Sequence, residues 1–339
     1  MSLKLTRVTR RYPGSSVVAV DGIDLEIADG TLLCLLGPSG CGKTTTLRMI
    51  AGLDTVDGGA IELDGRVVDD PANGVLVAPE HRNLGLVFQH YALWPHMRVQ
   101  KIVEFGLVQR KVEAKERKRR VAEILERLSL SEYANRYPSE LSGGQQQRVA
   151  TARTLVTGPK ILLMDEPLSN LDTQLRSDTR ETIRALHREF GCTTVFVTHD
   201  QAEAMALADQ VAVMHGGKIA QLGAPLAVYD TPQTLEVARF IGTPPMNILP
   251  GDHWFVAAHA IGATHVGVRP EALIVSMADD GWTVRATSPT GTSWIHMLEK
   301  DGTVLTSHST ARIAAPGDMV AVRFDPVALH RFGADGTRL

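Results

Sequence analysis

The chain has 339 residues, of which 44% are hydrophobic and 22% charged, which predicts a globular protein of about two domains. Its 35 basic and 38 acidic residues give a net charge of −3, which argues against a polybasic nucleic-acid binder. The apolar runs are too short to span a bilayer, and the first residues lack the apolar core of a signal peptide. The three cysteines form no disulfide framework. These features predict a soluble cytoplasmic chain and exclude the membrane-spanning, secreted and disulfide-stapled classes.

Buried strands alternate with helical patterns through the first part of the chain. Buried strands are predicted over 32–36, 161–164 and 194–197. A helix is predicted over 43–51, and a second helical pattern ends at Phe190, where Gly191 is placed to cap it. Strands that alternate with helices are typical of an α/β fold with a mostly parallel sheet.

The region from about 91 to 156 has a helical pattern instead. Within it, the segment 109–120 carries seven basic and two acidic residues and no aromatic residue. Nucleic-acid binding would favour aromatic side chains for stacking, so we interpret this segment as a solvated helix face. A membrane-surface or partner contact is the alternative.

The composition changes again after about residue 239, where Pro and Gly become frequent. Short alternating runs follow, which predict the strands of a small β-rich domain. We place the domain boundary near residue 240. The predicted strands are 265–268, 282–286, 294–298, 304–307 and 319–324.

A phosphate-binding pattern follows the first buried strand. Residues 37–44 read GPSGCGKT and match G-x-x-x-x-G-K-[ST] at the start of a predicted helix. Glycines let several backbone N–H groups converge on one anion, and the helix N-terminus adds partial positive charge. Lys43 can supply a full charge to the β- and γ-phosphates and act in catalysis, and the Thr44 hydroxyl can ligate Mg²⁺. The predicted nucleotide-binding residues of this loop are Gly37, Pro38, Ser39, Gly40, Cys41, Gly42, Lys43, Thr44 and Thr45.

Two acidic residues end the predicted strand 161–164. Asp165 and Glu166 therefore lie at the carboxyl end of a strand, where open α/β sheets bind their ligands. Asp165 can hold the Mg²⁺ that bridges the phosphates. Glu166 projects differently and can polarise an attacking water, so we predict it to be catalytic.

The run Leu141-Ser142-Gly143-Gly144-Gln145 resembles the signature motif of ABC ATPases. Ser142 is a candidate N-cap, and the two glycines expose backbone N–H groups at a helix start. This segment would be a second anion-binding loop in the chain, and it has no lysine of its own. That arrangement makes sense if the segment contacts the ATP that another copy of the chain holds. The resemblance therefore implies a head-to-tail homodimer, with Ser142, Gly143, Gly144 and Gln145 contacting the nucleotide.

Other landmarks of the ABC family match in order. Gln89 resembles the Q-loop glutamine, which implies roles in catalysis and in binding Mg²⁺. Asp172, in 169–172, resembles the D-loop and is expected at the nucleotide, and His199 resembles the switch histidine that contacts the γ-phosphate. Tyr12 stands where the family places an aromatic that stacks on adenine. The resemblance covers residues 1 to about 235 and implies a P-loop NTPase, with a RecA-like core and a helical subdomain at about 90–156.

The rest of the chain is similar to the importer ATPases that energise maltose-type sugar uptake. Residues 240–247 and 267–271 look like the linker and the β-domain of those proteins, which implies a small OB-fold-like (TOBE) regulatory domain over 240–339. Residues 91–96 are similar to the segment where the family docks a membrane subunit. The resemblance implies two transmembrane permease subunits, an indirect solute-binding protein, no nucleic acid, and a peripheral location at the cytoplasmic face of the inner membrane.

The implied function is ATP hydrolysis that drives import of a small solute. A sugar, polyol or glycerol-type cargo is favoured, while polyamine, ferric-ion and sulfate importers share the layout. The ATPase of an exporter is disfavoured by the GVRPE element at 267–271. A non-transport ABC protein is disfavoured because the chain has one cassette, no long insertion and no C-x-x-C pair.

Overall fold

The computed structural model describes residues 1–339, apart from the side chain of Asp279. The chain divides into two compact units, Met1–Pro225 and Leu226–Leu339. This division lies earlier than the boundary near residue 240 that the sequence favoured. The intervening residues group with the second unit because Leu235 N–H donates to Gly336 O (2.8 Å) and Ala238 packs in a cluster with Phe332.

A six-stranded sheet in the order β11-β10-β3-β9-β8-β7 forms the centre of the first unit. All neighbouring strands from β10 to β7 are parallel, and only β11 runs antiparallel to its neighbour. The strands are β3 (Leu32–Leu36), β7 (Leu84–Val87), β8 (Ile161–Asp165), β9 (Thr193–Thr198), β10 (Gln210–His215) and β11 (Lys218–Gly223). Every residue of β3 and β9 is buried, as expected for strands covered on both faces. The predicted α/β fold is therefore confirmed.

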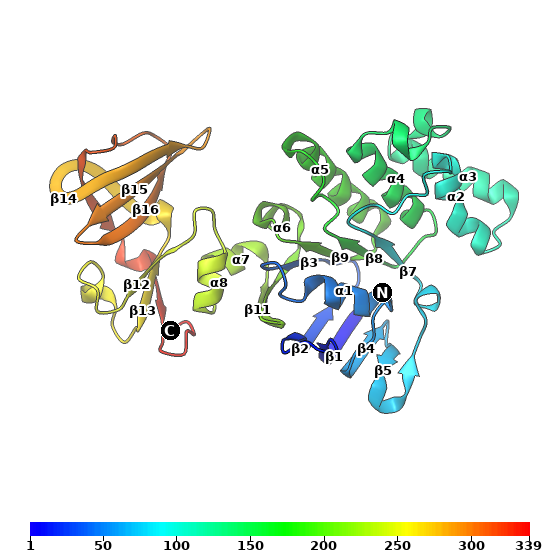
Figure 1. Ribbon diagram of the computed structural model, residues 1–339, viewed down its shortest axis with the longest axis horizontal. Coiled ribbons are helices and arrows are strands. Elements are labelled where there is room, and N and C mark those ends of the chain that lie inside the picture. Colours follow the sequence, from blue (N-terminus) through cyan, green and yellow to red (C-terminus); the bar gives the residue numbers. More distant parts are fainter. The chain divides into compact units, whose positions relative to one another are not determined.

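A second, antiparallel sheet with the order β2-β1-β4-β5-β6 completes this unit. Helix α1 (Lys43–Ala51) lies between the two sheets (Figure 1). Its Leu47 and Ile50 join the apolar core that both sheets share. The strands are β1 (Leu3–Arg11), β2 (Val18–Ile27), β4 (Gly58–Leu63), β5 (Arg66–Asp70) and β6 (Val75–Leu76).

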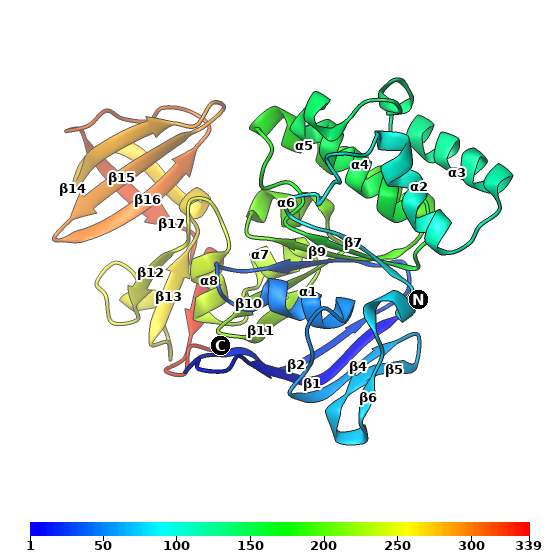
Figure 2. The same ribbon diagram turned by 45° about the vertical axis from the view of Figure 1, so that its right-hand side comes forward.

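Helices cover the face of the central sheet away from α1 (Figure 2). The predicted helical region contains α2 (Val99–Gln109), α3 (Ala114–Arg127) and α4 (Gly143–Leu155), and α5 (Thr173–Phe190) and α6 (Gln201–Leu207) follow along the chain. Gly191 ends α5 in the left-handed conformation, with φ of 58°, as the sequence predicts. None of the helices in the described part of the chain has the length and apolar character of a membrane span.

The second unit is β-rich, which confirms the sequence-based expectation. Its three-stranded sheet has the order β12-β13-β18 and its four-stranded sheet the order β16-β15-β14-β17. Trp282, Leu298 and Val320 are buried in its main core. The elements are α7 (Pro225–Asp230), α8 (Leu235–Phe240), β12 (Asn247–Pro250), β13 (His265–Val268), β14 (Leu273–Pro289), β15 (Trp294–Lys300), β16 (Thr303–Ser309), β17 (Met319–Phe324) and β18 (Leu329–Phe332).

Candidate functional site

The loop 37–42 joins β3 to α1 and is held by close backbone contacts. A Cβ atom on Gly37 would lie 2.3 Å from the carbonyl oxygen of Met214, so only glycine fits there. Gly42 has φ of 102°, and a Cβ atom on it would lie 2.3 Å from the carbonyl oxygen of Ala19. The loop is therefore built on glycine at both of its ends.

The ammonium group of Lys43 and the N-terminus of α1 both supply positive charge to this loop. Lys43 is only 5% exposed, and its Nζ donates to the carbonyl oxygens of Gly37 (2.7 Å) and Pro38 (3.0 Å). Helix α1 has no side-chain cap at its N-terminus. The first N–H groups of a helix lack partners within the helix, so these donors are available to an anion. Ser39 and Gly40 are exposed, whereas Cys41 is buried beside Lys43.

The two acidic residues after β8 lie directly opposite this loop. The hydroxyl of Thr44 donates to Oδ1 of Asp165 over 3.0 Å. Burial raises the pKa of Asp165, the hydrogen bond from Thr44 opposes that shift, and the negative charge of Glu166 adds to it. A cation at this position would relieve both the burial of charge and the repulsion. Hydroxyl and carboxylate oxygens are also the ligands that Mg²⁺ prefers.

The side chain of Glu166 lies close to side chains from two other loops. Its Oε2 lies 3.2 Å from Nδ1 of His199 and 3.5 Å from Nε2 of Gln89. These residues follow β8, β9 and β7, which are adjacent parallel strands. The backbone of Glu166 has φ of 42°, and its N–H donates to the carbonyl oxygen of Val197. The sheet thus brings together three of the four side chains that the sequence assigned to catalysis.

Hydrogen bonds from nearby residues hold the loops that carry His199 and Gln89. The sequence analysis did not identify all of these residues. Thr198 donates to buried Glu203 (2.6 Å) and accepts from the N–H of Asp200 (3.0 Å), which holds the turn that carries His199. Burial raises the pKa of Glu203. Asn170 donates to the carbonyl oxygen of Gln89 (2.9 Å). No local pattern marks Glu203, because its partner becomes evident only when α6 packs beside β9.

Tyr12 and Thr45 lie near each other on the same side of α1. Tyr12 directly follows β1, and 38% of its surface is exposed. Its hydroxyl lies 3.5 Å from Oγ1 of Thr45 and donates to Oδ2 of Asp54 over 2.6 Å. The predicted aromatic residue is therefore close to the helix that begins at the phosphate-binding pattern.

The signature-like segment forms a separate cluster. Ser142 and Gln145 form a capping box at the start of α4, and Asp172 caps α5 by accepting from the N–H of Leu175 (3.0 Å). Cβ atoms on Gly143 and Gly144 would touch Leu171 and Leu175. In the described part of the chain, no hydrogen bond or ion pair joins this cluster to residues 37–45.

In the segment 91–96, Trp94 contacts Phe105 of α2 and Arg153 of α4. Trp94 is half-buried, and its ring centre lies 4.6 Å from that of Phe105. The guanidinium of Arg153 lies over the Trp94 ring and donates to the carbonyl oxygen of Tyr91 (3.0 Å). The exposed residues beside them include Phe105 and Val108, which are 37% and 43% exposed.

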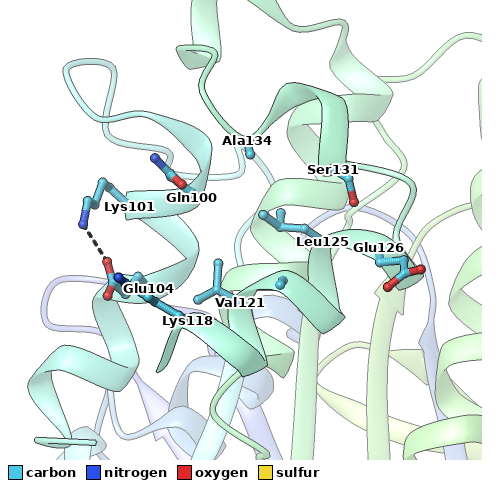
Figure 3. Close-up of a pocket in the computed structure, with 10 residues that line it drawn as sticks. Gln100, Lys101, Glu104, Lys118, Val121, Leu125, Glu126, Ser131 and Ala134 are labelled. Atoms are coloured by element: carbon cyan, nitrogen blue, oxygen red, sulfur yellow. Dashed lines mark hydrogen bonds and ion pairs between the residues drawn. The ribbon is translucent and has the colours of Figure 1, made fainter. Parts of the chain in front are cut away.

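A groove of about 580 Å³ lies between α2, α3 and the short turn Ser131–Tyr133 (Figure 3). Val121 and Leu125 give it an apolar side, and the ion pair between Lys101 and Glu104 (2.9 Å) lies at its rim. None of the predicted nucleotide-binding or catalytic residues lines this groove. It is therefore distinct from the site at the strand ends.

The sequence is similar to proteins of known class. A family model described as ABC transporter matches residues 20–169. An sn-glycerol-3-phosphate import ATP-binding protein, UgpC of Rhodopseudomonas palustris (strain HaA2), is 41% identical over 367 residues, which cover 98% of each chain. The chain belongs to the ABC import ATP-binding proteins. It is accordingly an ATP-binding and ATP-hydrolysing subunit of importer type, as the sequence motifs predicted.

Another relative and a solved structure support this membership. The trehalose/maltose import ATP-binding protein MalK of Thermococcus litoralis is 52% identical over 233 residues, or 69% of this ABC import protein and 63% of the relative. The dimeric ATP-binding cassette MJ0796, solved in a post-hydrolysis state bound to ADP and Pi, is 32% identical with a TM-score of 0.57. That match covers 66% of this ABC import protein and 98% of the cassette.

Proposed function

We propose that this ABC import protein hydrolyses ATP at the edge where β3, β7, β8 and β9 end, and that hydrolysis drives uptake of a sugar, polyol or glycerol-type compound. The observation that carries the site is the position of Glu166, within 3.2 Å of His199 and one residue from the Asp165–Thr44 hydrogen bond. The names of the relatives, which import sn-glycerol-3-phosphate or trehalose and maltose, support the cargo class.

The phosphates occupy the loop of α1 in this proposal. Backbone N–H groups of residues 40–45 donate to them, and Lys43 leaves the carbonyl oxygens of Gly37 and Pro38 to contact the β- and γ-phosphates. Tyr12 stacks on the adenine. Preorganised donors of this kind stabilise the charge that develops on a transferring phosphoryl group.

Thr44, Asp165 and Gln89 are the residues that would hold Mg²⁺. Their hydroxyl, carboxylate and amide oxygens suit the ion, and the raised pKa of Asp165 fits a carboxylate placed to share its charge with a cation. When bound, the ion supplies positive charge that neutralises the phosphate oxygens.

Glu166 orients and polarises the attacking water in this mechanism. Its carboxylate is held between His199 and Gln89, so one oxygen has a fixed direction while the other can accept from a water. His199 then contacts the γ-phosphate, and Gln89 relays loss of that phosphate to the helical region through the loop that follows β7.

A second copy of the chain completes each site. Ser142, Gly143, Gly144 and Gln145 present a helix N-terminus with no link to residues 37–45 of their own chain. We infer that they and Asp172 contact the nucleotide of the partner subunit, so that two copies enclose two nucleotides. The similarity to a dimeric cassette bound to ADP and Pi supports this arrangement.

Membrane permease subunits, two per complex, are the partners we propose for the segment 91–96. The half-buried Trp94 beside exposed Phe105 gives this surface the mixed aromatic character of a docking site. The protein then acts at the cytoplasmic face of the inner membrane and meets the solute-binding protein only through the permeases.

Removal of the Lys43 ammonium tests the proposed site. We expect Lys43→Ala in the full chain to lower ATP binding or hydrolysis by at least about 100-fold, because it removes the buried charge of the phosphate loop. Lys218→Ala, which removes a lysine side chain 66% exposed, is the matched control and is expected to hydrolyse ATP like the parent. Hydrolysis by Lys43→Ala at the parent rate would overturn the proposal.

The cargo class needs a separate experiment. The chain reconstituted with its permeases and solute-binding protein is expected to hydrolyse ATP faster when a sugar, polyol or glycerol phosphate is added. Stimulation by a polyamine, ferric ion or sulfate instead would replace the proposed cargo while leaving the ATPase site intact.

A further inference from the structure

Asp54 lies at the centre of a small charged network beside Tyr12. It follows the end of α1, where its N–H donates to the carbonyl oxygen of Arg48 (3.3 Å). One carboxylate oxygen accepts from the Tyr12 hydroxyl (2.6 Å) and the other from Nη2 of Arg10 (2.6 Å). The Asp54 side chain is 11% exposed and Tyr12 is 38% exposed, so this contact lies at the surface of the protein. Asp54 therefore links Tyr12 to the C-terminal end of α1, the helix whose N-terminal end follows the loop 37–42.

Arg10 covers one face of the Tyr12 ring and so limits where a base can stack on it. Its guanidinium carbon lies 5.0 Å from the ring centre, over one face of the ring. Nη1 of Arg10 is also held by Asp57 (2.7 Å), so the guanidinium is fixed by two carboxylates. One face of the ring is thus covered, and a nucleobase can stack only on the opposite face.

We propose that Asp54 is a positioning residue for the nucleobase, which acts by holding the Tyr12 ring against Arg10 with one face presented to the base. This inference rests on the proposed nucleotide site and on the stacking role of Tyr12. A hydrogen bond to an ionised carboxylate is stronger than a neutral one, so it fixes the ring before the ligand arrives. Preorganisation of this kind improves affinity because less freedom is lost on binding.

The chemistry of stacking also defines which ligands are recognised by the open face of the Tyr12 ring, which we call the base platform. Every nucleobase has a π-face, so stacking on one ring tolerates different bases. The Asp54 network therefore strengthens the binding of nucleoside triphosphates in general and does not select adenine over guanine. It contributes nothing to inorganic tripolyphosphate, which has the phosphates but no base.

Equilibrium binding of ATP, GTP and tripolyphosphate to the full chain, with Mg²⁺ present, tests the proposal. Tyr12→Phe removes only the hydroxyl, and Asp54→Ala removes its acceptor. Each is expected to raise the Kd for ATP and for GTP by about three- to tenfold, the loss expected for one hydrogen bond. The double variant is expected to be no weaker than the worse single variant, because both changes break the same contact. The Kd for tripolyphosphate stays within about twofold. Asp178→Asn, which changes an exposed carboxylate on α5 and leaves the Tyr12–Asp54 bond in place, is the control and is expected to bind ATP like the parent.

Different failures have different meanings. If Tyr12→Ala weakens ATP binding while Tyr12→Phe and Asp54→Ala do not, the stacking role stands and the positioning role of Asp54 is wrong. Additive effects of the two single variants, or an equal loss of tripolyphosphate binding, would also overturn it. If Tyr12→Ala binds ATP like the parent while Lys43→Ala does not, the base platform fails and the phosphate site stands. If Lys43→Ala both binds and hydrolyses ATP like the parent, the proposed function itself fails.

Discussion

The two units of the molecule distribute their titratable side chains in different ways. In the first unit, β3, β9, β8 and β7 are parallel neighbours, so their carboxyl ends share one edge of the sheet. The segments that follow them carry Gln89, Glu166 and His199 in loops and Lys43 at the start of α1. In the second unit all paired strands are antiparallel, so successive strand ends lie at opposite edges. Its buried histidines, His296 and His330, lie within strands instead.

This difference shows how topology creates a reactive site. A parallel sheet collects loops from distant sequence positions at one edge, so polar side chains can meet without being buried in the core. In an antiparallel sheet a polar side chain that points inward must be satisfied where it lies. His296 Nε2 accepts from the N–H of Ile313 (3.3 Å), and burial lowers the pKa of this histidine. We therefore expect substitutions in the first unit to affect nucleotide chemistry, and substitutions in the second to affect stability.

The largest effect on stability is expected at Gly37, which packs closely against the backbone of Met214. Gly37→Ala would place a Cβ atom 2.3 Å from the carbonyl oxygen of Met214, so β10 or the loop must shift. Overpacking of this kind costs about 1–3 kcal/mol of unfolding free energy, and the displaced loop should bind ATP much more weakly. Denaturant unfolding and ATP titration of the same preparation measure both effects.

Gly74→Ala is the control for Gly37→Ala. Gly74 has φ of 66° and open space around its missing Cβ, so alanine brings backbone strain of about 1–2 kcal/mol without a clash. We expect it to lower stability and leave ATP affinity unchanged. Equal losses of ATP affinity in the two variants would contradict the special role of the contact at Gly37.

Acid sensitivity is the effect expected for the second unit. Burial, with help from the charges of Arg338 and Arg269, lowers the pKa of His330 to about 4. The unfolded chain takes up this proton first, near pH 6.5, so His330 contributes its full stability above that pH and loses it as the pH falls towards 4. Between pH 7.5 and pH 5 the expected loss of unfolding free energy is about 2 kcal/mol.

His330→Gln checks this expectation by removing the titrating group. The free energy of unfolding of the variant should fall less between pH 7.5 and pH 5 than that of the parent, by about the amount given above. The same substitution at exposed His81 should leave the parent's pH dependence unchanged. An unaltered pH dependence in His330→Gln would show that this buried histidine does not govern acid sensitivity.

The smallest effect is expected on the basic face of α3. Arg119 is 56% exposed and pairs with Glu116 (2.7 Å) and Glu123 (2.6 Å) along its own helix. Exposed pairs contribute little to stability, because water and salt screen them. Arg119→Gln should shift the thermal midpoint by less than about 2 °C and leave ATP hydrolysis unchanged. A larger loss of hydrolysis would show that charges on this face also take part in function.

Three strands of the central sheet, β3, β8 and β9, could be predicted from the sequence, because they are buried along most of their length and mostly apolar. The antiparallel sheet could not. Strand β2 alternates buried and exposed residues, and β1 pairs with it through register shifts after Leu5 and Val8, which breaks the simple alternation. Strand β18 was missed because it is short and contains two polar residues, His330 and Arg331.

The candidate site residues stand in recognisable sequence motifs, whereas the residues that hold them in place do not. Lys43, Asp165 and Glu166 stand in short motifs whose chemistry depends on neighbours in the sequence. The contacts from Asp54 to Tyr12 and from Glu203 to Thr198 join a helix or its end to a strand end. Such pairs have no local pattern, because they exist only once α1 and α6 have packed against the sheets.

A comparison of ATP binding and ATP hydrolysis in Glu166→Gln tests the proposed catalytic site most directly. The variant keeps the shape of the side chain and its contacts with Gln89 and His199 but loses the negative charge that polarises water. We expect it to bind ATP like the parent and to hydrolyse it about 10²- to 10⁴-fold more slowly, the usual contribution of a general base. Asp178→Asn, at an exposed carboxylate on α5, is the control. Hydrolysis by Glu166→Gln at the parent rate would contradict the catalytic role assigned to Glu166.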